Sequence, residues 1–200
     1  MELTAEIIGG LGVALNEATL VGLELDIPGR RAGITFDVLT LPMEGEPAED
    51  CRLLLVLSNV GRVAASYRLG NWNHVAAEVV ALKLEALTEV VTSFGQQPIY
   101  GRHFFDRSDD FSTWADRLSL DARLDGGLAH SLLLFQEGAG DRHLDLCIWF
   151  DLLSFRDPLG NALSPGEVIA GGQRWWESYG RYKERGPTVK IPDQQIIPLP

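Results

Sequence analysis

The most constraining feature of the sequence is the segment from His143 to Phe155, in which the side chains follow a two-residue period. Successive side chains of a β-strand point to opposite faces, so this period predicts a long strand with one apolar face. That face carries Leu144, Leu146, Ile148, Phe150 and Leu152, and the other face carries His143, Asp145, Cys147, Trp149 and Asp151. The second set is neither a typical solvent face nor a typical core face, which makes it the first place to look for a binding surface.

Other segments predict antiparallel strands by the same alternation. Before residue 70, two pairs of alternating segments are joined by short turns that contain glycine, proline or asparagine, as hairpin turns do. These segments, 19–27, 33–41, 52–57 and 62–69, are expected to form one four-stranded meander. Segments 118–124, 128–136 and 143–155 are expected to form a second, three-stranded meander.

Three segments have apolar residues at helical spacing. Residues 3–15 predict a short helix that its glycines weaken, and residues 84–93 predict a central helix that ends before Gly95. A longer helix over 165–183 is predicted, because the serine, proline and glutamate of 164–167 have the spacing of a helix N-terminus. Residues 94–117 lack a clear period and fit either a functional loop or an irregular packed connection.

These elements predict an α+β fold with a predominantly antiparallel sheet. We expect two meanders with about seven strands, a short central helix and a longer C-terminal helix packed against the sheet. A β-sandwich or a barrel with added helices is the alternative architecture. A chain of 200 residues with 46% hydrophobic composition can close one substantial core, so a single domain over 1–200 is expected, with an extended proline-rich tail at about 187–200.

The charge of the chain narrows the choice of partner. With 17 basic and 28 acidic residues, the net charge is −11 and the pI is near 4.7. This field repels phosphate backbones and anionic lipids, so we expect no nucleic acid and no membrane as partner, and a basic protein instead. The same charge serves solubility equally well without any partner.

The cysteines and the N-terminal segment indicate a cytoplasmic protein. Cys51 and Cys147 are too few for a disulfide framework. The N-terminal segment has Glu2 and Glu6 in place of a basic region, and nowhere does an apolar run reach about 18 residues.

A row of side chains on the mixed face of the later meander is the predicted ligand site. In the tightest hairpin registers, Arg123 lies opposite His130, and His130 lies opposite Trp149. Arginine and indole offer flat contact area and charged hydrogen bonds, which suit recognition. With the irregular loop beside the row, the candidate ligand-binding residues are Arg123, His130, Trp149, Tyr100, His103 and Asp106. Alternatively, the helix that carries residues 175–182 packs on this face and the row is only its polar rim.

Carboxylate pairs do not reach catalytic or metal-binding spacing. Asp145 and Asp151 share a strand face but lie about 20 Å apart at ~3.4 Å per residue, which is too far for a glycosidase pair. As a calcium loop from Asp106, the sequence has Phe111 where glycine is required and Arg117 where the bidentate glutamate belongs. A solvated acidic turn is the simpler interpretation of this segment.

Motifs for zinc, nucleophilic catalysis and phosphate binding are also missing. The chain has neither HExxH, CxxC nor GxSxG, so we expect no metal, no cofactor and no catalytic residue. Cys147 could act as a nucleophile only if a histidine such as His130 activated it, and a strand cysteine is more often an inert small hydrophobe.

Three functions remain open. The first is a non-catalytic acidic interaction protein, of the inhibitor or immunity type, that binds a basic protein with the acidic loop 42–50. Its expected contact residues are Glu44, Glu46, Glu49 and Asp50. The second is a small-molecule-binding or enzymatic domain with its site on the face of Arg123, His130 and Trp149. The third is a structural homo-oligomer joined by the C-terminal helix, in which Trp176 meets the partner because adjacent helical side chains point about 100° apart.

Overall fold

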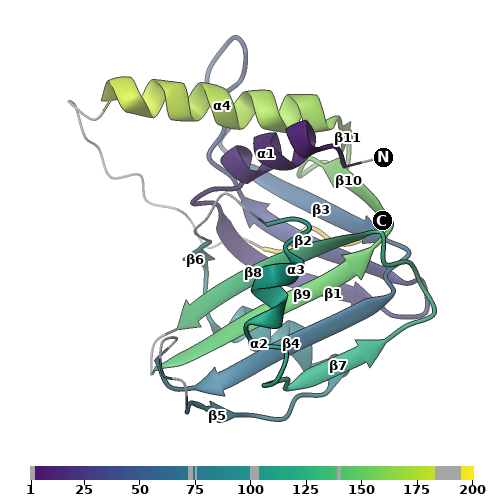
Figure 1. Cartoon of the computed structure of the whole chain (residues 1–200). Helices are drawn as coiled ribbons and strands as arrows, with labels where there is room; N and C mark the ends of the chain where they lie inside the picture. Colours follow the sequence, from purple (N-terminus) through teal and green to yellow (C-terminus); the bar gives the residue numbers. More distant parts are fainter. Residues whose placement is uncertain (1–2, 72–73, 75, 100–103, 139–140, 183–194) are drawn as a thin grey trace.

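The chain forms two open antiparallel sheets with helices around them, as Figure 1 shows. This arrangement, seen in a computed structural model, confirms the α+β class and the antiparallel pairing expected from the alternation. The structure describes residues 3–71, 74, 76–99, 104–138, 141–182 and 195–200.

The first sheet has six strands and the second has five. In spatial order, the first contains β11 (Ala162–Leu163), β10 (Leu152–Arg156), β3 (Arg52–Ser58), β2 (Arg31–Asp37), β1 (Thr19–Asp26) and β6 (Gln97–Pro98). The second contains β5 (Glu78–Val79), β4 (Arg62–Leu69), β9 (Arg142–Phe150) and β8 (His130–Gly138), and β7 (Leu120–Arg123) pairs with β4. The helical elements are α1 (Ala5–Ala14), the 3-10 turn η1 (Leu84–Ala86), α2 (Leu87–Ser93), α3 (Ser108–Ser112) and α4 (Pro165–Tyr182).

The chain passes from one sheet to the other at two places where the sequence predicted no crossing. The alternating run over 143–155 is split at Asp151, so that β9 lies in the second sheet and β10 in the first. The connection at 59–61 likewise leads from β3 in the first sheet to β4 in the second. The predicted four-stranded meander is therefore wrong: β1, β2 and β3 form a meander, and β4 belongs elsewhere. At the crossing at Asp151 the buried face changes: Leu152, which was expected on the core face, is 52% exposed, whereas Leu153 and Phe155 are buried. The alternation of apolar residues in the sequence did not reveal this change, because Leu152 and Leu153 are both apolar.

The pairing predicted for β7 is also wrong. We expected 118–124 to form a hairpin with 128–136, but β7 pairs with β4, with Arg62 opposite Arg123. β8 pairs with β9 as predicted, although its register differs from the tightest one. Distant strands with matching apolar faces compete with the local hairpin, so sequence proximity did not decide this pairing.

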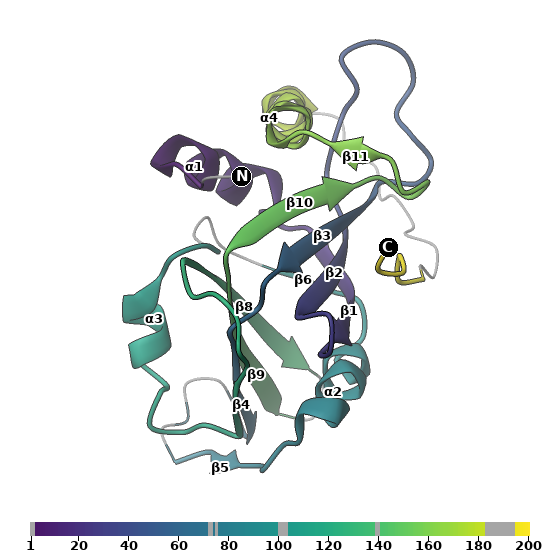
Figure 2. The same cartoon turned by 90° about the vertical axis from the view of Figure 1, so that its right-hand side faces the viewer.

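The main core lies between the two sheets. The even-numbered residues of β9 that were predicted to face the core are buried there, together with Phe36 and Phe155 of the first sheet. The outer face of the second sheet carries a smaller cluster, in which Trp114 packs on Ala64 and Cys147. Figure 2 shows the segment that contains α3 on this outer side, so part of the irregular region covers the sheet.

The end of the chain covers the outer face of the first sheet. Residues 195–200 lie there, with Ile197 buried and Leu199 against Gly33. A Cβ at Gly33 would come within 2.8 Å of Leu199 Cδ2, so the close approach depends on glycine. The remainder of the predicted tail, 187–194, lies outside the described residues.

α4 packs on α1 at one end of the molecule and not on the mixed sheet face (Figure 1). Its N-terminus is the predicted capping arrangement: the Glu167 carboxylate accepts from Ser164, and Glu167 N donates to Ser164 Oγ. The Trp176 indole N–H donates to Val13 O at 3.0 Å, which ties α4 to α1. The alternative in which the aromatic helix covers the face of Trp149 is therefore wrong. Within the described residues, no helix is both long and apolar enough to cross a membrane.

Candidate functional site

The predicted row of Arg123, His130 and Trp149 does not assemble. Arg62 stands between Arg123 and Trp149, and Trp149 faces Ser131 on β8. His130 pairs with Phe150, whose side chain is in the core, so it belongs to the opposite face of the sheet. A shift of one residue in the β8–β9 register produced this change of face.

His130 and Asp106, two of the predicted site residues, do meet. Asp106 Oδ2 lies 3.0 Å from His130 Nδ1, and Asp106 Oδ1 accepts from the Ser131 N–H at 2.8 Å. Asp106 adopts a φ of 55°, a left-handed conformation that directs its carboxylate at the edge of β8. Tyr100 and His103, the other predicted loop residues, lie outside the described residues.

The ring of Trp149 already contacts other side chains of the chain. The Arg62 guanidinium lies over its ring at 4.6 Å and over the Phe111 ring at 5.0 Å. The same guanidinium binds Asp121 through two hydrogen bonds of 2.7 and 3.1 Å. The sequence analysis did not identify Arg62 as a site residue. Arg62 and Arg68 are six residues apart on β4, and this even spacing places both side chains on one face of the sheet.

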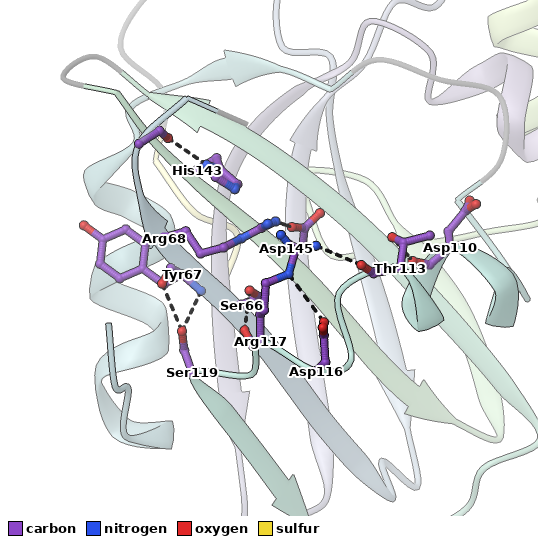
Figure 3. A network of polar contacts seen from close by, with 11 residues as sticks. Ser66, Tyr67, Arg68, Asp110, Thr113, Asp116, Arg117, Ser119, His143 and Asp145 are labelled. Carbon is purple, nitrogen blue, oxygen red and sulfur yellow. Dashed lines mark hydrogen bonds and ion pairs between the residues drawn. The ribbon is translucent and has the colours of Figure 1, made fainter. Parts of the chain in front are cut away.

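A polar network fills the other half of the outer face, next to this aromatic stack (Figure 3). Arg68 forms an ion pair with Asp145, and the arginine is only 4% exposed. Ser66 Oγ donates to Arg117 O at 2.6 Å, and the Ser119 hydroxyl accepts from Tyr67 N at 2.7 Å. These bonds attach the segment after α3 to β4.

Burial sets the electrostatics of this network. Removal from water raises the pKa of the Asp145 carboxyl, and Arg68 and Arg117 offset only part of that effect. His143 is fully buried beside Arg68, and burial lowers the pKa of its imidazole. Its Nδ1 lies 2.9 Å from Gly70 O, which requires the proton on that nitrogen, while Nε2 has no partner among the described residues.

A cavity of about 490 Å³ lies against this network. Its lining consists of Arg68, Thr113, Trp114, Arg117, Phe135 and Asp145. A neighbouring cavity of about 260 Å³ shares Thr113, Trp114, Phe135 and Asp145 with it. The two therefore form one hollow beside the buried ion pair, on the sheet face that the sequence singled out.

The acidic loop 42–50 lies beside α4, away from α3 and β9 (Figure 2). It is exposed throughout, and Glu44, Glu46 and Glu49 have no hydrogen bond or ion pair to any described residue. Asp50 differs, because its carboxylate binds Arg52 at 2.6 Å and the arginine lowers its pKa.

An apolar cavity of about 280 Å³ lies at the base of this loop. Its walls include Val38, Leu39, Leu41, Leu53, Leu163 and Val168. Its rim carries the carboxylates of Glu46, Asp50, Asp157 and Glu167 and the guanidiniums of Arg52 and Arg174. Arg174 Nε donates to Leu41 O at 2.9 Å, and Leu41 N donates to Gly171 O at 3.1 Å, so α4 holds one end of the loop in place.

The nucleophile and metal candidates stay without support among the described residues. Cys147 is fully buried, and burial raises the pKa of its thiol, which opposes formation of the reactive thiolate. Within the described ranges, no three His, Cys, Asp or Glu side chains gather closely enough to hold a metal ion.

Comparison with protein-family models, with curated proteins and with solved structures gave no match. The function is therefore argued from the surfaces and cavities of the chain itself.

Proposed function

We propose that this protein is a non-catalytic interaction protein, of the inhibitor or immunity type, that binds a basic protein through its acidic loop 42–50. One observation carries the proposal: three carboxylates with no partner among the described residues stand on an exposed loop whose base is an apolar cavity.

The unpaired charges of the loop favour a cationic partner. Glu44, Glu46 and Glu49 lie within six residues of one another, so their fields add at the tip of the loop. A chain with a net charge of −11 also steers basic proteins toward itself over longer distances. Charges of this kind increase the association rate and select the partner more than they add affinity.

The cavity supplies the apolar part of such an interface. A volume of about 280 Å³ receives one or two side chains, and interfaces typically gain most of their energy from a few residues buried in such pockets. The acidic rim then selects an apolar side chain that is flanked by lysine or arginine. Because α4 anchors the base of the loop at Leu41, the cavity exists before the partner arrives.

The test is affinity capture from extract of the source cells with the full chain, at low and at high salt, followed by quantitative mass spectrometry. We expect a stoichiometric basic protein that high salt releases. The triple variant Glu44→Gln, Glu46→Gln, Glu49→Gln is expected to capture at least about tenfold less of it, because each exposed charge contributes on the order of 0.5 kcal/mol.

The matched control removes the same charge at the other end of the molecule. Glu78, Glu85 and Glu89 are exposed and lie on β5, η1 and α2, away from the loop (Figure 1). Their triple replacement by glutamine should leave capture unchanged. If both triple variants captured equally less of the basic protein, net charge alone would explain the capture. This result would contradict a defined site at the loop.

One observation favours the homo-oligomer as a second candidate function. Trp175 and Tyr179 stack at 5.0 Å on α4, and Tyr179 stays 43% exposed. The indole N–H of Trp176, by contrast, is used within the chain. Light scattering on the wild type and on Tyr179→Ala tests this candidate, and a wild-type monomer at all concentrations removes it.

A further inference from the structure

We propose that the hollow over β4 and β9 binds a small organic carboxylate with a flat apolar body, which Arg68 and Arg117 hold by its charge and Trp114 and Phe135 by its ring. This site is independent of the acidic loop.

Arg68 has hydrogen-bond donors that no described residue uses. A guanidinium has five N–H donors, and within the described part of the chain only one from Arg68 has an acceptor, on Asp145. Its Nε is buried without a partner, although the residue is only 4% exposed. A buried guanidinium with unused donors is costly, so an acceptor in the hollow that Arg68 lines gains a charged hydrogen bond to this side chain.

The balance of charge selects an anion. Two guanidiniums, those of Arg68 and Arg117, line the larger cavity, where Asp145 is the single acidic residue among the described lining residues. Asp110 lines the neighbouring cavity, but its carboxylate is paired with Arg107 at 3.0 Å. Arg117 also contacts Asp116 at 3.4 Å, but Asp116 is 82% exposed, and pairs with such carboxylates contribute little. One additional negative charge therefore balances the site.

The nearby Asp145 limits that charge to one. A dianion such as phosphate would be repelled by the Asp145 carboxylate, which lines the hollow. A carboxylate carries a single charge and matches the planar fork of a guanidinium with two parallel hydrogen bonds.

The walls select a flat apolar body. Trp114 is buried on one wall, while Phe135 keeps 41% of its surface exposed where the hollow opens. An exposed phenyl ring beside a cavity gains free energy when another ring covers it. The larger cavity alone has about 490 Å³, within the usual range of small-molecule sites of roughly 300–1,000 Å³.

Calorimetry on the full chain with four small probes tests the chemistry. Benzoate, 2-naphthoate, benzamide and benzamidine share an aromatic ring and differ in charge or size. We expect both carboxylates to bind, benzoate at least about tenfold tighter than the neutral benzamide, and benzamidine not at all. Equal binding of benzoate and benzamide, or no binding of either carboxylate, would overturn the proposal. Inorganic phosphate is the fifth probe, and tighter binding of phosphate than of benzoate would overturn the carboxylate assignment.

Variants place the binding in the hollow. Arg117→Gln and Phe135→Ala should each weaken carboxylate binding by about tenfold, because one loses a charged donor and the other a ring contact. Arg107→Gln is the matched control, since Arg107 lies on the same segment, pairs with Asp110 and does not line the hollow. Wild-type affinity in both Arg117→Gln and Phe135→Ala would refute the site.

Arg68→Lys tests the buried arginine directly, because it keeps the charge and removes the planar fork. We expect it to bind benzoate about tenfold more weakly than the wild type. If this variant does not fold, the Arg117 and Phe135 variants still decide the question. The triple loop variant that tests the basic partner should bind benzoate like the wild type, so either proposal can fail alone.

Discussion

Asn59 Nδ2 donates a hydrogen bond of 2.5 Å to Asp151 Oδ2, which joins the two places where the chain passes from one sheet to the other. Asp151 also accepts from the Ala129 N–H at 3.2 Å, and its own N–H donates to Ser58 O at 3.2 Å. Gly127 lies so close that a Cβ there would overlap the Asp151 carboxylate. The two crossings are thus one structural unit.

The first prediction concerns this unit. Asn59 has a φ of 56°, so Asn59→Gly should lose only the hydrogen bond, at about 1–2 kcal/mol, whereas Asn59→Ala should lose about 1 kcal/mol more through left-handed backbone strain. Urea unfolding of both variants measures the difference. A glycine variant less stable than the alanine variant would show that the backbone of Asn59 is not strained.

The second prediction concerns the buried pair of Arg68 and Asp145. Arg68→Met or Asp145→Leu alone should lower the free energy of unfolding by about 3 kcal/mol, because each leaves a charge buried without its partner. The double variant should recover most of that loss, since no buried charge remains. Chemical denaturation of all four proteins gives the coupling energy, and additive losses would contradict the interpretation as an ion pair.

The third prediction concerns pH and His143. Burial lowers the pKa of His143 below its ordinary value of 6.5, so the unfolded chain takes up a proton there before the folded one does. The free energy of unfolding should therefore fall as the pH decreases below about 6.5. In His143→Gln this fall should be smaller, while the control variant of the exposed His74, His74→Gln, keeps it.

Asp145 acts with the opposite sign, and this separates the two groups. Its pKa in the folded protein is raised above 3.8. Its contribution to the free energy of unfolding is therefore fully present below that pH and is lost as the pH rises through the pKa of the folded state. The difference between the wild type and His143→Gln at each pH isolates the histidine. A pH profile identical in the two proteins would contradict a buried neutral His143.

The fourth prediction concerns the C-terminal residues 195–200. Ile197 is buried against Leu54 and Val56, and its N–H donates to Thr35 Oγ1 at 3.0 Å. Ile197→Ala should cost about 1–3 kcal/mol of unfolding free energy, the value of burying such a side chain. Leu159→Ala is the control, since Leu159 is 87% exposed. Equal thermal midpoints for the two variants would show that this segment contributes nothing to stability.

The sequence predicted the elements better than their partners. β9 shows this most clearly, because its apolar side, from Leu144 to Phe150, is the core face that the alternation predicted. The capped start of α4 and the chain reversal between β1 and β2 were likewise predicted, since both depend on residues close in sequence. The contact of His130 with Asp106 joins two predicted site residues, but in an arrangement that no local pattern indicated.

The site on the outer face shows the opposite case. His143 and Asp145 were noticed as unusual strand residues, yet Arg68, their partner on β4, was not connected with them. Asp145 and Arg68 are 77 residues apart, and they meet because β4 joins the second sheet and pairs with β9.

The sequence by itself determined the α+β class, the core face of β9, the helix boundaries and the acidic loop, because side-chain periodicity, capping and charge act over a few residues. Only the tertiary structure decided which sheet each strand joins, which register places His130 on the core side, and which side chains line the hollow beside Arg68. These outcomes depend on packing between distant segments, where several pairings satisfy the same local alternation and the total buried surface selects among them.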